Sequence, residues 1–131
     1  MKNYLLALTI GALLLAPSIA NARPHHRHHH GHHVYETGRP AGCPHAWCGC
    51  WARIQKGIND VRLNLAAAWK HVGTPAAHGC IDCIAVIGNH HVGIVKGYDA
   101  KGNVILLSGN HGHKVGIGTY ARSRVSAYRN V

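Results

Sequence analysis

The 131-residue sequence contains no phenylalanine, only four acidic residues, and no internal repeat. With three tryptophans, five tyrosines and no phenylalanine, the core has to be built from valine, isoleucine, leucine and alanine. Beyond residue 22 no apolar run is long enough to cross a bilayer, so no membrane-spanning helix is expected there. The length and the missing repeat predict one domain.

The scarcity of acidic residues leaves the chain strongly basic. Fourteen lysines and arginines face four acidic residues, which gives a formal net charge of +10 with the histidines neutral. Such a field attracts anionic polymers, among them cell-wall polymers, lipopolysaccharide, acidic membrane surfaces and nucleic acid. The composition therefore predicts an anionic partner.

Residues 1–22 have the pattern of a secretory signal peptide. Lys2 precedes an apolar run over residues 5–15, and the segment closes on Ala20, Asn21 and Ala22. The run is too short for a bilayer span, which an uncleaved anchor would need, and the ending fits cleavage after Ala22. We therefore expect a periplasmic or secreted protein with no stable membrane insertion after cleavage, and no nucleic acid as its partner.

Residues 23–42 are expected to be a disordered, histidine-rich tail and an irregular lead-in. The segment RPHHRHHHGHH carries seven of the fourteen histidines and no apolar residue. It has the composition to chelate nickel, copper or zinc, and the alternative that we favour is a solvated spacer. The histidines of this weak alternative metal site are His25, His26, His28, His29, His30, His32 and His33.

The five cysteines are an odd number for an exported chain, which leaves one thiol unpaired. If Cys48 is the free thiol, the other four form two disulfides in one of three pairings. These four are Cys43, Cys50, Cys80 and Cys83. The alternative is a zinc site, because two close cysteine pairs have His45 and His78 nearby.

The remaining chain, residues 43–131, predicts an α+β domain. Apolar spacing indicates one helix over residues 46–56 and a second over residues 65–71. Short β-rich runs separated by glycine then follow. The expected strands cover residues 81–87, 91–98, 103–108, 115–120 and 124–129, with residues 99–102 as a hairpin connection.

Three residues in this domain form a candidate catalytic set. Cys48 lies at a predicted helix start, where backbone N–H groups and the helix dipole favour thiolate over thiol. His91 opens a strand and shares a face with Gly93, which predicts that a helix approaches closely on that face. Asn110 ends the next strand, where its amide oxygen would orient the imidazole.

Four segments resemble the CHAP and NlpC-type papain-like cysteine amidohydrolases. They are WCGCW, HHVGIV, ILLSGN and the closing SAYRNV. The resemblance implies a papain-like α+β domain over residues 43–131, with N-terminal helices packed on an antiparallel β-sheet. It also implies a monomeric enzyme without cofactor or metal, which cleaves amide bonds in peptidoglycan as an endopeptidase or amidase.

In this resemblance Cys48 is the nucleophile, His91 the general base and Asn110 the orienting residue. The partner would be peptidoglycan or another anionic cell-wall polymer. Two other hypotheses stay open from the sequence. One is an exported metal-binding protein that uses the histidine-rich tail, and the other is a catalytically inactive relative that binds the cell wall.

Overall fold

The structure is a computed structural model that describes residues 38–131. The predicted signal peptide, the histidine-rich tail and the first part of the lead-in lie outside these residues. Within the described part, no helix is long and apolar enough to cross a membrane.

The helical half of the domain precedes the sheet in the chain. Helix α1 spans Cys48–Gln55 and ends where Gly57 takes a left-handed conformation with φ of 66°. The second helix predicted over residues 65–71 is instead the 3₁₀ helix η2 (Ala66–His71), and another 3₁₀ helix, η1 (Val61–Asn64), precedes it. Leu65 separates them because its backbone is extended, with φ of −87° and ψ of 124°.

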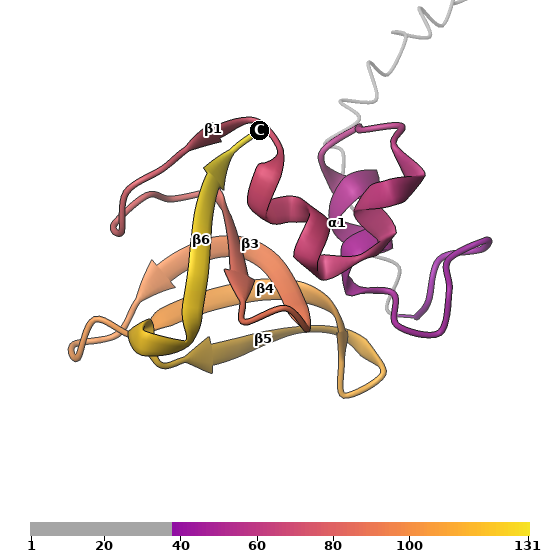
Figure 1. Ribbon diagram of the computed structural model, residues 1–131. Helices are drawn as coiled ribbons and strands as arrows, with labels where there is room; N and C mark the ends of the chain where they lie inside the picture. The colour runs from indigo at the N-terminus through magenta and orange to yellow at the C-terminus, as the bar shows by residue number, and fades with distance from the viewer. Residues whose placement is uncertain (1–37) are drawn as a thin grey trace, which may run out of the picture. The chain divides into compact units, whose positions relative to one another are not determined.

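Six strands form one open, entirely antiparallel sheet in the order β1-β6-β2-β3-β4-β5. The strands are β1 (Thr74–Pro75), β2 (Ile84–Ile87), β3 (His91–Tyr98), β4 (Val104–His111), β5 (Lys114–Tyr120) and β6 (Val125–Asn130). A third 3₁₀ helix, η3 (Arg122–Arg124), links β5 to β6. Figure 1 shows α1, η1 and η2 on one side of the curved sheet, so the expected combination of helices and antiparallel sheet is confirmed.

The sheet separates two apolar clusters. On the helical side, Val92 and Ile94 of β3 pack with Trp51 of α1 and its neighbours. On the other side, Val95 packs with Leu106 of β4. The alternation along β3 therefore directs the face that begins with Val92 toward α1.

The prediction that a helix approaches the sheet at Gly93 is wrong. A Cβ at Gly93 would lie 2.9 Å from the carbonyl oxygen of Leu107 and 2.9 Å from Cβ of Ser108, both on strand β4. The close approach occurs one strand further on, where a Cβ at Gly109 would lie 2.5 Å from Cβ of Trp51. Glycine at position 109 thus brings α1 against the sheet.

The disulfide prediction is confirmed. Cys43 pairs with Cys50 and Cys80 pairs with Cys83, while Cys48 is free. Two disulfides are compatible with an exported protein. They also remove the thiolates on which the alternative zinc site depended.

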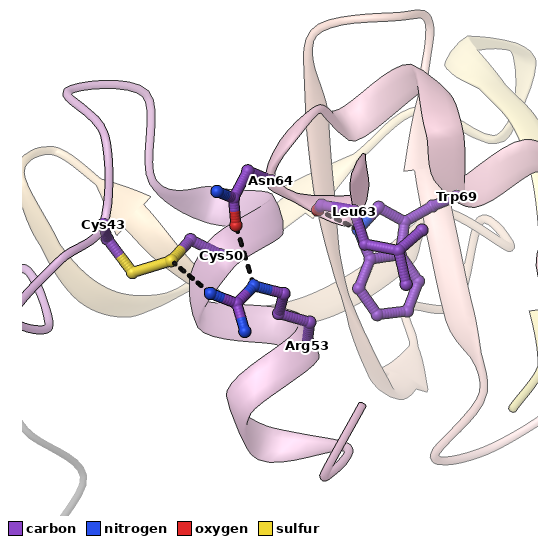
Figure 2. Close-up of a disulfide and its surroundings, with 6 residues drawn as sticks. All are labelled: Cys43, Cys50, Arg53, Leu63, Asn64 and Trp69. Atoms are coloured by element: carbon purple, nitrogen blue, oxygen red, sulfur yellow. Dashed lines mark hydrogen bonds between the residues drawn. A yellow bond between two sulfur atoms is a disulfide. The ribbon is translucent and has the colours of Figure 1, made fainter. Parts of the chain in front are cut away.

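Figure 2 shows how the first disulfide ties the segment before α1 to the helix. Arg53 donates through Nε to the side chain of Asn64 at 2.8 Å, and its Nη2 lies 3.7 Å from the sulfur of Cys50. The nearby indole of Trp69 donates to the carbonyl of Leu63 at 2.8 Å. These contacts fix α1 to η1 and η1 to η2, and the disulfide holds the start of α1 in place.

Candidate active site

Cys48 is the first residue of α1 and lies against the beginning of β3. Its side chain is buried, and its thiol donates to the carbonyl of His90 at 3.8 Å. The backbone N–H of Val92 also interacts with the sulfur. The sulfur therefore contacts the peptide groups on both sides of His91.

The thiol is held in its neutral form. Burial raises the pKa of Cys48, and the backbone N–H groups of Val92, Gly49 and Cys48 itself act in the opposite direction with less effect. The sequence predicted that the helix start would favour the thiolate. The N–H groups are present as expected, but desolvation outweighs them because the side chain is almost fully enclosed.

His91 begins strand β3, and its side chain is partly buried. Burial, with a smaller contribution from the charge of His111, lowers the pKa of His91 to about 4. The imidazole is thus neutral at neutral pH and able to accept a proton. A neutral thiol and a neutral imidazole agree with each other, because a thiolate–imidazolium ion pair would lower the pKa of Cys48 and raise the pKa of His91.

Ser108 on β4, and not Asn110, is the residue in contact with the imidazole. Nε2 of His91 lies 2.8 Å from Oγ of Ser108, and the Ser108 side chain is fully buried. Gly93 leaves the space for this contact, because Cβ of Ser108 lies close to where a Cβ of Gly93 would stand. Nε2 is thus engaged, and among residues 38–131 no hydrogen bond joins the imidazole to the Cys48 thiol.

Asn110 lies in an irregular part of β4, where the pairing with β5 shifts register between Ser108 and His111. Its φ of 57° places it in the left-handed region that asparagine tolerates. Among residues 38–131 no hydrogen bond joins Asn110 to His91. A catalytic role of Asn110 therefore stays a prediction, while the orienting contact belongs to Ser108.

Tyr120 on β5 extends the polar cluster beyond Ser108. Its ring lies 5.5 Å from that of His91, and its hydroxyl lies 3.4 Å from Nδ1 of His111. Burial raises the pKa of Tyr120, and the Ser108 hydroxyl partly offsets this. Ser108 and Tyr120 are absent from the sequence-predicted site because only the folded sheet brings three strands together here.

Two hollows of the described surface are lined in part by basic side chains. One has a volume of about 290 Å³ and is lined by Arg39, His45, Trp47 and His113. The other has a volume of about 470 Å³, and its lining includes His90 and Arg124. Trp47 and His90 are the chain neighbours of Cys48 and His91, but neither Cys48 nor His91 lines a hollow.

No carboxylate of the described residues faces these hollows. Asp60 forms an ion pair with Arg62 at 2.7 Å, and Asp82 forms another with Lys96. Asp99 accepts hydrogen bonds from the hairpin backbone that follows it. The charged side chains that line the two hollows, Arg39 and Arg124, are therefore all basic.

The histidines of the zinc alternative are not gathered into a metal centre. His78 packs its ring 4.5 Å from Tyr98 and bonds through Nε2 to the carbonyl of Gly102, whereas His45 lies near His113. Between residues 38 and 131 no group of three or more histidine, cysteine or acidic side chains could hold a metal ion.

Comparison with known proteins adds no relative. No protein-family model, curated protein or solved structure matches this chain. The functional argument therefore depends on the site itself.

Proposed function

We propose that the protein is an exported cysteine hydrolase of the papain-like type that cleaves amide bonds in cell-wall peptidoglycan. The observation that carries the proposal is the position of the Cys48 thiol. It lies at a helix start between the peptide groups that flank His91, and a buried hydroxyl engages Nε2 of that histidine. A nucleophile, a base and a residue that orients the base are the minimum set for acyl transfer through a thiol.

The proposed reaction begins with a neutral Cys48 thiol and a neutral His91 imidazole. The Cys48 S–H turns from the carbonyl of His90 and gives its proton to Nδ1 of His91 as the sulfur attacks the amide carbon. The backbone N–H of Cys48, at the helix start, stabilises the oxyanion, a contribution of about 3–4 kcal/mol per donor. The tetrahedral intermediate then collapses, and the imidazolium returns the proton to the leaving amine.

The second half releases the acyl group from sulfur. The neutral His91 takes a proton from water while the water oxygen attacks the thioester carbon. The thioester bond breaks, the carboxylic acid leaves, and the proton on His91 returns to the Cys48 sulfur. Ser108 keeps Nε2 of the imidazole fixed through both halves, so that Nδ1 performs every proton transfer.

The basic hollows support an anionic substrate. Peptidoglycan stem peptides carry free carboxylates, which match Arg39 and the histidines near Cys48 on one side and Arg124 on the other. Export to the periplasm or the exterior and action as a monomer belong to the same proposal, and the two disulfides agree with the first.

The test is hydrolysis of purified peptidoglycan sacculi, followed by the appearance of new amino groups and by mass spectrometry of the fragments. We expect the wild-type protein to release fragments and Cys48→Ala and His91→Ala to release none, with circular dichroism showing that both variants fold. His71→Ala is the matched control, since it changes an exposed histidine that lines neither hollow and should keep activity. Equal release by the wild type and Cys48→Ala, or binding to sacculi without any cleavage, overturns the proposal.

A further inference from the structure

The two disulfides differ in how they are placed in the chain. Cys80 and Cys83 lie together in the connection between β1 and β2. Cys43 and Cys50 instead join the segment before α1 to the helix (Figure 2). A cross-link over a sequence separation of 3 restricts the unfolded chain less than one over a separation of 7. The first pair should therefore contribute less to stability, and its C-x-x-C spacing is that of cysteine pairs that exchange disulfides.

The two pairs also differ in their access to solvent. Cys43 and Cys50 are 8% and 0% exposed, and Cys83 is 3% exposed. Cys80 is partly exposed, and the two residues that separate it from Cys83 are exposed. Thiol–disulfide exchange needs a thiolate that reaches one sulfur of the disulfide. An external thiolate can thus approach Cys80, while both cysteines of the other disulfide are enclosed.

Hydrogen bonds hold the Cys80–Cys83 segment in place without help from its sulfur atoms. On strand β3, the carbonyl of Val95 accepts from the backbone N–H of Asp82, and the N–H of Val95 donates to the carbonyl of Cys83, each at 2.8 Å. The hydroxyl of Tyr98 donates to the carbonyl of Cys80 at 3.1 Å. Because these bonds involve neither sulfur, the segment should keep its conformation when the disulfide opens. The two thiols would then stay within reach of each other.

Two lysines supply positive charge beside this pair. Lys56 donates to the backbone carbonyl of Asp82 at 2.6 Å, and Lys96 forms an ion pair with the Asp82 carboxylate. Two ammonium groups therefore meet one carboxylate at the residue before Cys83, which leaves one net positive charge. This charge attracts an incoming thiolate and stabilises a departing cysteine in its thiolate form.

The free thiol does not belong to this group of residues. Cys48 packs in the apolar cluster on the helical side of the sheet, whereas Cys83 packs in the cluster on the other side. Exchange at Cys80 and Cys83 therefore leaves the candidate active site unchanged.

We propose that Cys80 and Cys83 form a redox-active centre that exchanges with dithiols, while the other disulfide is structural. The centre is independent of the proposed hydrolase activity. A thiolate of the dithiol attacks Sγ of Cys80, the bond between the two cysteine sulfurs breaks, and Cys83 leaves as a thiolate that takes up a proton. The second thiolate of the dithiol then attacks the dithiol sulfur of the mixed disulfide, and Cys80 leaves and takes up a proton. The dithiol is oxidised to a disulfide by two electrons, and the protein gains two thiols.

The experiment treats the folded wild-type protein with dithiothreitol at neutral pH, without denaturant. Samples are quenched in acid, separated from the reductant and alkylated, and mass spectrometry of their peptides gives the reduced fraction of each disulfide over time. We expect the Cys80–Cys83 disulfide to be reduced at least about tenfold faster than the Cys43–Cys50 disulfide. Circular dichroism should stay unchanged during this phase, and oxidised dithiothreitol should restore the first disulfide. Equal rates for the two disulfides, or reduction of Cys80–Cys83 only as the protein unfolds, overturn the inference.

The contribution of the lysines is tested with Lys56→Gln, which removes one of the two ammonium groups. Reduction of the Cys80–Cys83 disulfide should be severalfold slower in this variant, because the net positive charge beside the pair is lost. Lys114→Gln is the matched control, since it removes the same charge from β5 at the far edge of the sheet, and it should keep the wild-type rate. Equal rates in Lys56→Gln and Lys114→Gln overturn the part assigned to the lysines.

Discussion

Replacing Gly109 by alanine should push α1 away from the sheet. The added Cβ would lie 2.5 Å from Cβ and 2.7 Å from Cγ of Trp51, and 2.7 Å from Cζ3 of Trp47. Both indoles are at most 2% exposed, so neither ring has a solvent side to move toward. Gly109 has no left-handed φ, so crowding is the only penalty.

Overpacking a filled core costs about 1–3 kcal/mol, and we expect Gly109→Ala to lower the free energy of unfolding by that amount. Since Trp47 directly precedes Cys48, the displaced helix should also move the thiol away from β3. The rate of hydrolysis should therefore fall by more than the loss of folded protein alone explains. Urea unfolding followed by tryptophan fluorescence measures the first effect, and hydrolysis measured well below the unfolding midpoint measures the second.

Gly97→Ala provides the matched control for this change. A Cβ at Gly97 meets nothing within 4 Å, and its φ is not left-handed. Alanine there should leave the free energy of unfolding within about 0.5 kcal/mol of the wild-type value. Equal unfolding midpoints for Gly109→Ala and Gly97→Ala would refute the packing of α1 on β4 described above.

Three further predictions concern ionisation and the disulfide. Because the pKa of His91 is about 4 in the folded protein and about 6.5 when unfolded, the unfolded chain binds the extra proton between these values. Stability should therefore fall by up to about 3 kcal/mol as pH drops from about 6.5 to about 4, and a His91→Gln variant measured by urea unfolding should lack this loss. Because the pKa of Cys48 is raised above its ordinary value of 9.0, alkylation by iodoacetamide should still accelerate as the pH rises past 9.0, whereas a plateau at acidic pH would indicate an ion pair with His91 instead. Replacing Cys43 and Cys50 together by serine should lower the free energy of unfolding by about 2.5 kcal/mol in the chain-entropy estimate, and an unchanged thermal midpoint would contradict this.

Local patterns predicted most of the elements. Strand β3 has the bounds expected from its alternation, His91–Tyr98, and β5 begins one residue earlier than expected. Strand β1 was missed because it consists of Thr74–Pro75 alone and exists only through pairing with β6, far away in the chain. The second helix was predicted from apolar spacing that 3₁₀ turns also satisfy over such short lengths.

The site was predictable where it depends on sequence position, and less so where it depends on the sheet. Cys48 begins α1 and His91 begins β3, as predicted, while their catalytic roles stay predictions. The contact of Ser108 with His91 could not be predicted, because it needs the neighbouring strand and the space that Gly93 leaves. The raised pKa of the Cys48 thiol was also missed, since the burial that raises it comes from packing that no local pattern encodes.

The most direct test of the account is to trap the covalent intermediate. Purified protein is mixed with soluble peptidoglycan fragments, quenched in acid within the first turnover and digested, and its peptides are weighed by mass spectrometry. The account predicts a thioester adduct on the peptide that contains Cys48, with the mass of the acyl part of the substrate, and no adduct in His91→Ala. Fragment release by the wild type without any adduct on Cys48, or undiminished release by Cys48→Ala, would contradict it.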